Sequence, residues 1–232
     1  MASLPKGSTY AIPTTFGSPI TVTSVTNASS AVCTAVAHGL IDGDVVEFSS
    51  GWSKANRRVF KVDQLTVDTF ALVDCDTGNG ALFPAGSGIG SVKKITGWTQ
   101  IPKVMNPSMS GGEPKNVVYE FIEDENEYTI FNGWSAMTYT LEIDDDTTTA
   151  GYAALVAQSE VQTDTVLRIL KKGGVNPTYI PCTVAINTGP VQQEGQIDRL
   201  RVQFSGRARP TRYTGAVYLT LSARFGGLSL PA

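Results

Sequence analysis

Only a few side chains of this 232-residue chain could carry out chemistry, and their spacing favours structural roles. His38 is the only histidine, so any histidine-based acid–base or triad chemistry would have to use it. It lies in the turn Ala37-His38-Gly39-Leu40, and we interpret it as structural. The run Asp144-Asp145-Asp146 could bind a cation, but it lacks the spaced oxygen ligands and the loop glycine of an EF-hand. We interpret these aspartates as partners of the positive end of a helix.

Other kinds of chemical site have equally weak sequence signals. Cys33, Cys75 and Cys182 are an odd number without a close pair, so they show neither zinc spacing nor a disulfide framework. No phosphate-binding glycine motif is present, and Gly86-Ser87-Gly88-Ile89-Gly90 is interpreted as a flexible loop. A carboxylate pair for glycoside hydrolysis stays open, because such carboxylates meet in space rather than in sequence. We therefore predict a protein that is not an enzyme and that has no catalytic residue, metal or cofactor.

The composition indicates which elements position these residues. The chain has 23 glycines, 12 prolines and many Thr, Val and Ser residues, which favours strands and turns over helices. A mean hydropathy of -0.02 without a long apolar run argues against a membrane span, and the first 16 residues lack the features of a secretory signal. We predict a mainly β fold: a β-sandwich or barrel with one short covering helix, plus a small all-β insert.

The segment after residue 134 shows the clearest pattern of elements. Residues 137–143 alternate as a half-buried strand, and a helix is predicted over 148–159, with Thr147 or Thr148 as its cap. Tyr152, Leu155 and Val156 should share the covering face of that helix. Further strands follow, and their predicted ranges are 166–170, 178–186, 199–205 and 217–222.

Charge is distributed unevenly along the chain, although the net charge is only -3. Residues 113–164 contain twelve acids and one base, whereas six arginines and no acid follow Asp198. The strand predicted over 117–122 is apolar on both faces and precedes the acidic run 123–127, so we expect it between layers or at an interface. Such asymmetry either creates two complementary surfaces on one subunit or is neutralised within the fold across paired strands. Overall acidity argues against tight DNA binding.

The chain is divided into an N-terminal arm (1–17), a small β insert (18–95) and a larger β domain (96–232), with the first residues packing on that domain or on a neighbour. The insert resembles the small FCCH domain of ubiquitin-activating enzymes, which recurs in phage structural proteins. The resemblance implies a fold and no ubiquitin chemistry. The matching residues are Ala37-His38-Gly39-Leu40, Gly43-Asp44-Val45-Val46, Gly51-Trp52, Asn56-Arg57-Arg58-Val59-Phe60 and Thr69-Phe70-Ala71-Leu72.

Residues 135–212 resemble the tail tube protein of long-tailed, lambda-like phages. The points of likeness are the strand Thr138-Tyr139-Thr140-Leu141-Glu142-Ile143, the helix 148–159, the hairpin Lys171-Lys172-Gly173-Gly174, the strands 181–187 and 199–205, and the exit Gly206-Arg207-Ala208-Arg209-Pro210. Residues 117–134 resemble the inter-ring loop of that family. The resemblance implies a virion tail protein, made in the host bacterial cytoplasm, that self-assembles into hexameric rings stacked head to tail. It implies contacts with a tape measure protein, a tail terminator and tail-tip proteins, with genomic DNA passing through unbound and no membrane partner.

Two sets of candidate residues follow from this resemblance and from the charge pattern. Thr138, Thr140 and Glu142 are candidates for a wet strand face that lines the lumen, with the insert projecting outward. The candidates for inter-ring contacts are Glu120, Glu123, Asp124, Glu125, Glu127, Arg199, Arg201, Arg207, Arg209 and Arg212. The alternatives are another phage tail protein (terminator, baseplate or decoration) and a carbohydrate-binding or carbohydrate-cleaving β-protein, although Trp52, Trp98 and Trp134 are scattered in sequence.

Overall fold

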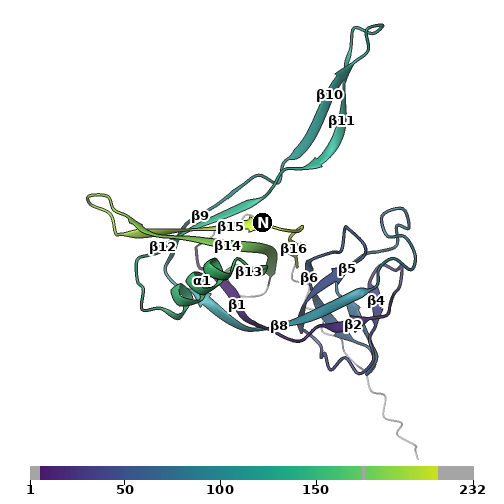
Figure 1. Ribbon diagram of the computed structural model, residues 1–232, viewed down its shortest axis with the longest axis horizontal. Coiled ribbons are helices and arrows are strands. Elements are labelled where there is room, and N and C mark those ends of the chain that lie inside the picture. Colours follow the sequence, from purple (N-terminus) through teal and green to yellow (C-terminus); the bar gives the residue numbers. More distant parts are fainter. Residues whose placement is uncertain (1–5, 174–175, 214–232) are drawn as a thin grey trace, which may run out of the picture.

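The computed structural model describes residues 6–173 and 176–213, and within them the chain is mainly β, as predicted (Figure 1). The described residues form sixteen strands and one α-helix. The predicted strand at 217–222 lies outside the described residues. None of the described helical structure is long and apolar enough to cross a membrane.

Fourteen strands form one curled antiparallel sheet in the order β3-β4-β7-β6-β5-β8-β1-β13-β14-β15-β12-β9, with β2 beside β8 and β16 beside β14. β10 and β11 form a separate two-stranded sheet. The strands of the N-terminal half are β1 Thr9–Phe16, β2 Ile20–Val22, β3 Ser24–Val25, β4 Ala31–Thr34, β5 Val45–Ser50, β6 Arg58–Gln64, β7 Thr69–Leu72 and β8 Gly90–Ile101. The others are β9 Val104–Ser110, β10 Pro114–Glu120, β11 Glu127–Trp134, β12 Thr138–Asp144, β13 Thr165–Leu170, β14 Pro177–Val191, β15 Arg199–Gly206 and β16 Thr211–Arg212.

The long strand β8 connects the small sheet region of the insert to the larger sheet. Val92, near its start, lies opposite Phe48 of β5 and Ile20 of β2, whereas Ile101, at its end, lies opposite Tyr10 of β1. Figure 1 shows the strands of the insert gathered on one side of the molecule, with β9, β12, β14 and β15 on the other. The two parts therefore share one backbone hydrogen-bond network.

The first residues of the chain contribute a strand to the sheet. The sequence predicts an arm without periodicity over 1–17, but Thr9–Phe16 forms β1 between β8 and β13. Tyr10, Ala11 and Ile12 are buried there, so their apolar side chains pack on the chain's own core. In the sequence these apolar residues lie among Ser, Thr and Pro, so they give no strand pattern. A strand with neighbours on both sides needs only a short apolar run.

Three groups of buried side chains form the core. Trp52, Phe48 and Phe60 belong to the core of the insert, and Leu141, Leu155 and Phe204 belong to the core of the larger domain. The third group joins the two parts: the side chains of Val59, Ile95, Val166, Tyr179 and Tyr213 pack together at the seam. The Tyr213 hydroxyl accepts the Lys61 backbone N–H at 2.7 Å, and this bond fixes the seam across 152 positions of sequence.

The single helix α1 spans Ala150–Val161, close to the predicted 148–159. Its N-cap is Thr149 rather than Thr147 or Thr148, and the Thr149 hydroxyl accepts the Tyr152 backbone N–H at 3.2 Å. Leu155 is fully buried, and Tyr152 packs partly buried against the same core. Gly151 is required at its position because an added Cβ would lie 2.6 Å from the carbonyl oxygen of Gln100. The helix therefore covers the sheet with its first two turns in close contact.

The aspartates lie before the start of the helix, but they do not cap it as predicted, because Thr149 is the N-cap and the first turn of α1 contains no acidic residue. Asp146 accepts hydrogen bonds from the backbone N–H and the hydroxyl of Thr148, and Lys103 bridges Asp144 and Asp146 at 2.7 and 3.1 Å. The bonds from Thr148 and then from Lys103 lower the pKa of Asp146 to about 2. The run therefore organises the turn into α1.

Candidate assembly surfaces

The β10–β11 hairpin projects from the body (Figure 1). It exposes apolar side chains along its whole length. Val118 is 57 % exposed, Phe121 58 % and Ile122 fully exposed. The strand ends at Glu120, two residues before the predicted end, so Phe121 and Ile122 lie in the turn. It does not lie between layers of its own chain. A single two-stranded hairpin is marginal in water, and a row of exposed apolar side chains favours contact with another surface.

Aromatic rings stiffen the outer half of this hairpin. Tyr119 stacks on Tyr128 across the strands with ring centroids 5.6 Å apart, and Phe121 contacts both rings. The Tyr128 hydroxyl donates a short hydrogen bond to Asp124, and this bond is the main reason that the pKa of Asp124 is lowered. The hairpin is therefore a preorganised element.

The acidic candidates gather at the end of the hairpin, as their sequence predicts. Glu120 lies directly opposite Glu127, and the turn between them carries Glu123, Asp124 and Glu125. We call residues 120–127 the acidic tip. Like charges at this density destabilise an isolated turn, so the tip favours a cationic partner.

The lumen candidates lie on one face of the sheet formed by β9, β12, β15 and β14. Thr138, Thr140 and Glu142 are cross-strand partners of Ser205, Gln203 and Arg201, whereas the intervening residues Leu141 and Ile143 are buried. The face is therefore polar, and its reverse packs against α1. Its other members are Ser108, Ser110, Asp144, Thr183, Ala185, Asn187 and Arg199.

Glu142 is neutralised within its own subunit. Its carboxylate accepts hydrogen bonds from the Asn106 amide at 2.7 Å and from the Arg199 guanidinium at 2.9 Å, and Arg201 lies 3.7 Å away. The Asn106 bond first, and then the two arginine charges, lower the pKa of Glu142. Arg199 and Arg201 thus share a face with the lumen candidates, and both already interact with Glu142. At these positions the charge asymmetry is neutralised within the fold across paired strands.

The remaining arginine candidates lie on another surface, together with cations that the sequence analysis did not select. A cleft of about 360 Å³ opens between the insert and the Gly206–Pro210 segment. We call it the basic cleft, and its charged residues are Lys54, Arg57, Arg58, Arg207 and Arg209. The only sequence signal for these cations is the adjacent pair Arg57-Arg58, which also belongs to the segment that resembles FCCH. Arg212 is exposed on β16, outside the lining of the cleft.

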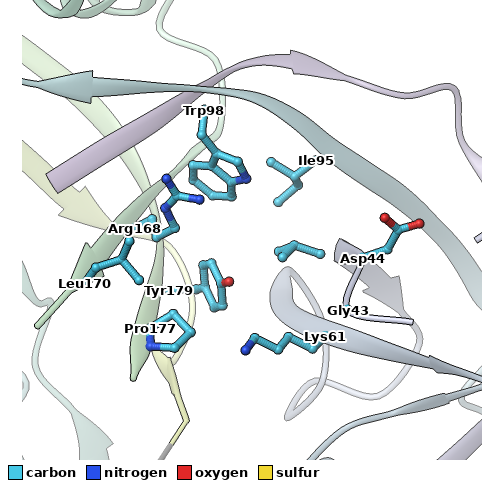
Figure 2. Close-up of a pocket in the computed structure, with 10 residues that line it drawn as sticks. Gly43, Asp44, Lys61, Ile95, Trp98, Arg168, Leu170, Pro177 and Tyr179 are labelled. Carbon is cyan, nitrogen blue, oxygen red and sulfur yellow. The ribbon is translucent and has the colours of Figure 1, made fainter. Parts of the chain in front are cut away.

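A second pocket, of about 430 Å³, lies at the seam between the insert and the larger domain (Figure 2). Figure 2 shows Arg168 beside Trp98, with Tyr179 next to them and with Lys61 and Asp44 on the opposite side of the pocket. The Arg168 guanidinium lies 4.3 Å from the Trp98 ring centroid, and Asp44 forms an ion pair with Lys94 at 2.7 Å. Asp44 is the only carboxylate of the lining, so this pocket lacks the pair that glycoside hydrolysis needs.

The residues with chemical potential have structural surroundings. His38 is buried: its Nδ1 accepts the Leu40 backbone N–H at 3.0 Å, so Nε2 carries the proton and donates to the Thr66 carbonyl at 3.1 Å. All three cysteines are buried free thiols, and burial raises the pKa of Cys33 to about 12. Among residues 6–173 and 176–213 no cluster of His, Cys, Asp and Glu could hold a metal ion.

The tryptophans do not form an exposed aromatic platform. Trp52 is buried and donates its indole N–H to the Pro84 carbonyl at 2.7 Å, and Trp98 is covered by Arg168. Trp134 is 54 % exposed at the root of the hairpin, against Phe131. The three rings come from different parts of the molecule, which gives no support to a glycan-binding face.

Comparison with known proteins identifies the family of the chain. A family model described as phage tail tube protein matches residues 50–215 of the 232, and no curated protein matches the chain. The matched segment includes the hairpin, the four strands of the polar face, the helix and the basic cleft. Because the match spans well over half of the sequence, the chain belongs to the phage tail tube protein family and is a structural component of the virion tail.

Proposed function

We propose that this chain assembles into hexameric rings that stack head to tail, forming the tube through which genomic DNA leaves a long-tailed, lambda-like phage. The observation that carries the proposal is the β10–β11 hairpin, whose apolar residues have no cover within the described chain. A projecting hairpin that fits a different patch on the next copy is a heterologous contact, and its repetition produces filaments.

Closure of each ring is supported by the strand directions in the polar face. β14, β15, β12 and β9 are consecutive and antiparallel, so a copy of β9 placed beside β14 would continue the alternation. β9 is the last strand of the sheet and its outer edge has no strand partner among the described residues. Beyond Cys182, β14 has no strand partner on the side of β13 within residues 6–173 and 176–213, although Ser159 and Gln162 bond Ile186 and Val184 there. Pairing of these edges between six copies would remove open edges from the tube.

The face of Thr138, Thr140 and Glu142 is proposed to line the lumen. Its hydroxyl and amide groups are uncharged, Arg199 and Arg201 share the Glu142 carboxylate, and Asp144 pairs with Lys103. Such a surface offers DNA phosphates little positive charge beyond the exposed Arg201, so it holds the DNA only weakly as it slides. This assignment leaves Arg207, Arg209 and Arg212 as the inter-ring candidates from the arginine set, because Arg199 and Arg201 belong to the lumen face.

The remaining parts of the proposal come from the family. Tube length would be set by a tape measure protein, and the ends would be closed by tail-tip and terminator proteins, all after synthesis in the bacterial cytoplasm. Residues 18–95 are proposed to have an FCCH-like fold. A terminator, baseplate or decoration protein remains the competing assignment within the tail.

Negative-stain electron microscopy of the concentrated protein near neutral pH tests the assignment. Hollow filaments or stacked rings are expected, and particles that stay single up to the highest soluble concentration, even with a tape measure and tail-tip initiator added, would contradict it. The variant with Glu123, Glu125 and Glu127 changed to Lys should remain folded but not form filaments, because the tip would then repel a cationic partner. Normal tubes from this variant would show that the acidic tip is not an inter-ring contact.

A further inference from the structure

The basic cleft has an excess of positive charge that its own subunit does not neutralise. Asp164 lies between Arg57 and Arg207, at 3.0 Å from each, and is thus shared by two cations. In the part of the chain that the structure describes, Lys54 and Arg209 form no ion pair, and both are exposed. Glu47 is a further carboxylate near Arg57, and it is half-buried.

Arg58 extends this excess into the wall of the cleft. Its guanidinium lies 4.8 Å from the Phe60 ring centroid and donates to the Thr211 hydroxyl at 3.3 Å, and it has no ion pair among the described residues. Arg58 therefore adds a further cation to the lining, and hydrogen bonds between guanidinium groups and carboxylates are among the strong ones. The excess of cations in the cleft favours the binding of carboxylates or of another anion.

An apolar groove continues the basic cleft. The groove has a volume of about 390 Å³, and it shares Trp134, Arg207 and Arg209 with the cleft. Its apolar walls come from Met109, Met137 and Pro210. The combined surface is thus basic at one end and apolar at the other, which matches a ligand that carries carboxylates beside large apolar side chains.

The acidic tip has this composition. Five carboxylates lie within eight residues, and the same turn exposes Phe121 and Ile122. We propose that the combined basic cleft and apolar groove receives the acidic tip of a second copy of this chain, so that the insert supplies part of the assembly contact. This inference rests on the proposed function, and it identifies the partner surface of the hairpin.

The chain's own tip cannot be the occupant. Trp134, at the root of the hairpin, lines both the cleft and the groove. β10 extends for seven residues from that root, so the tip lies about 23 Å away at roughly 3.3 Å per residue. The stacked rings of Tyr119 and Tyr128 stiffen the outer half of the hairpin, so the hairpin does not fold back on its own root. Only another molecule can therefore place a tip in the cleft.

Nucleic acid fits the cleft less well. A polyanion would use the cations, but the apolar groove of Met109, Met137 and Pro210 would stay uncovered. The chain also has a net charge of -3, which opposes DNA binding outside the cleft. The acidic tip of a second copy offers carboxylates to the basic cleft and the side chains of Phe121 and Ile122 to the apolar groove.

Charge reversal in the cleft tests the inference in the full-length protein. Lys54→Glu with Arg209→Glu should raise the concentration needed for tube formation about tenfold or more at low salt, because attraction becomes repulsion at two positions. Lys6→Glu with Lys172→Glu is the matched control, since both lysines are exposed, lie outside the cleft and change the net charge equally. Adding Glu123→Lys and Glu125→Lys to the cleft variant should restore assembly. Equal critical concentrations for the cleft variant and the control would refute the inference while leaving tube formation itself intact.

A cross-linking experiment tests the same contact without requiring tubes. Glu125→Cys in one tagged preparation is mixed with Lys54→Cys in another, under mild oxidation with oxidised glutathione. The three natural cysteines are buried, so the introduced thiols are the reactive ones. A disulfide-linked heterodimer should form in at least tenfold excess over a mixture with Lys6→Cys. A heterodimer yield equal to that of the Lys6→Cys mixture would overturn the inference. A second result would also overturn it: no cross-link forms, the unmodified protein binds a labelled single-stranded oligonucleotide, and the cleft variant does not bind it.

Discussion

Replacing Phe121 and Ile122 by serine should abolish assembly at concentrations that suffice for the unmodified chain, and it should leave the folded monomer unchanged. Phe121 is 58 % exposed and Ile122 is fully exposed, and the closest contacts of Phe121 are the exposed rings of Tyr119 and Tyr128. Substitutions at such exposed positions usually change the free energy of unfolding by less than about 0.5 kcal/mol. The monomer therefore serves as its own control for folding.

The effect on assembly follows from the apolar surface that a partner would cover. Complete burial of an exposed Phe or Ile side chain stabilises by about 1.5–3 kcal/mol, and Phe121 starts with roughly half of its surface already covered. The two side chains together should therefore contribute about 2.4–4.7 kcal/mol per hairpin. At 1.4 kcal/mol per factor of ten, the critical concentration should rise between about 50-fold and about 2,000-fold.

The measurement is the concentration of protein left in the supernatant after tubes are sedimented, with electron microscopy to identify the pellet. Val36→Ser with Val67→Ser is the matched control, because these side chains are 77 % and 64 % exposed on the insert, away from the hairpin. Urea denaturation of both variants verifies that the monomers are equally stable. A critical concentration within threefold of the unmodified chain would refute the reasoning, since the apolar tip would then stay uncovered in the tube.

Four further expectations concern the monomer. Leu155→Ala, at a fully buried position of α1, should lower the free energy of unfolding by about 2.7–5 kcal/mol in urea titrations, and a loss below about 1 kcal/mol would mean that the helix does not cover the core. Thr149→Ala removes the N-cap and should cost about 1 kcal/mol in the same assay, whereas Thr147→Ala should have almost no effect. Because hydrogen bonds lower the pKa of Asp146 to about 2, its contribution to stability is complete above about pH 4 and is lost as the pH falls to about 2; Asp146→Asn should flatten the stability profile in that window. A thiol reagent at pH 8 should label no cysteine in the native protein and all three after unfolding, because burial raises the pKa of Cys33, Cys75 and Cys182 to about 12, 11 and 12.

The elements that the sequence predicted well are those with a local signal. The alternation over 137–143 and the three-to-four spacing around Leu155 required only the period of a strand or a helix, and the structure has β12 and α1 within two residues of the predicted ends. The acidic tip was equally clear, since its charges are adjacent in sequence. β1 was missed because burial of Tyr10 and Ile12 depends on strands about ninety and one hundred and sixty residues away.

The basic cleft could not be predicted for the same physical reason. Lys54 and Arg57 lie in a turn of the insert, and Arg207 and Arg209 lie about 150 residues later, so only the packing of the seam brings them together. The sequence also treated the late arginines as one group, although β15 ends at Gly206, so Arg207 and Arg209 lie beyond the strand whose face carries Arg199 and Arg201. A strand reverses the direction of successive side chains, and a short loop turns them again, so proximity in sequence is a poor guide to a shared surface.

The pairing of charges inside the subunit separates the two roles that the charge pattern suggested. On the polar face, Glu142 is bound by Arg199 and Asn106, so that face presents little free charge to whatever passes along it. At the acidic tip, by contrast, five carboxylates face one lysine, Lys115, on the whole hairpin, and the cleft holds more cations than its carboxylates can pair. Unpaired charges of opposite sign at two distant sites lower the stability of an isolated subunit. This loss is recovered only when the acidic tip of one copy binds the basic cleft of another. High salt should therefore weaken tube formation while leaving the fold of the monomer unaffected, and a salt-independent critical concentration would place the contact on apolar surface alone.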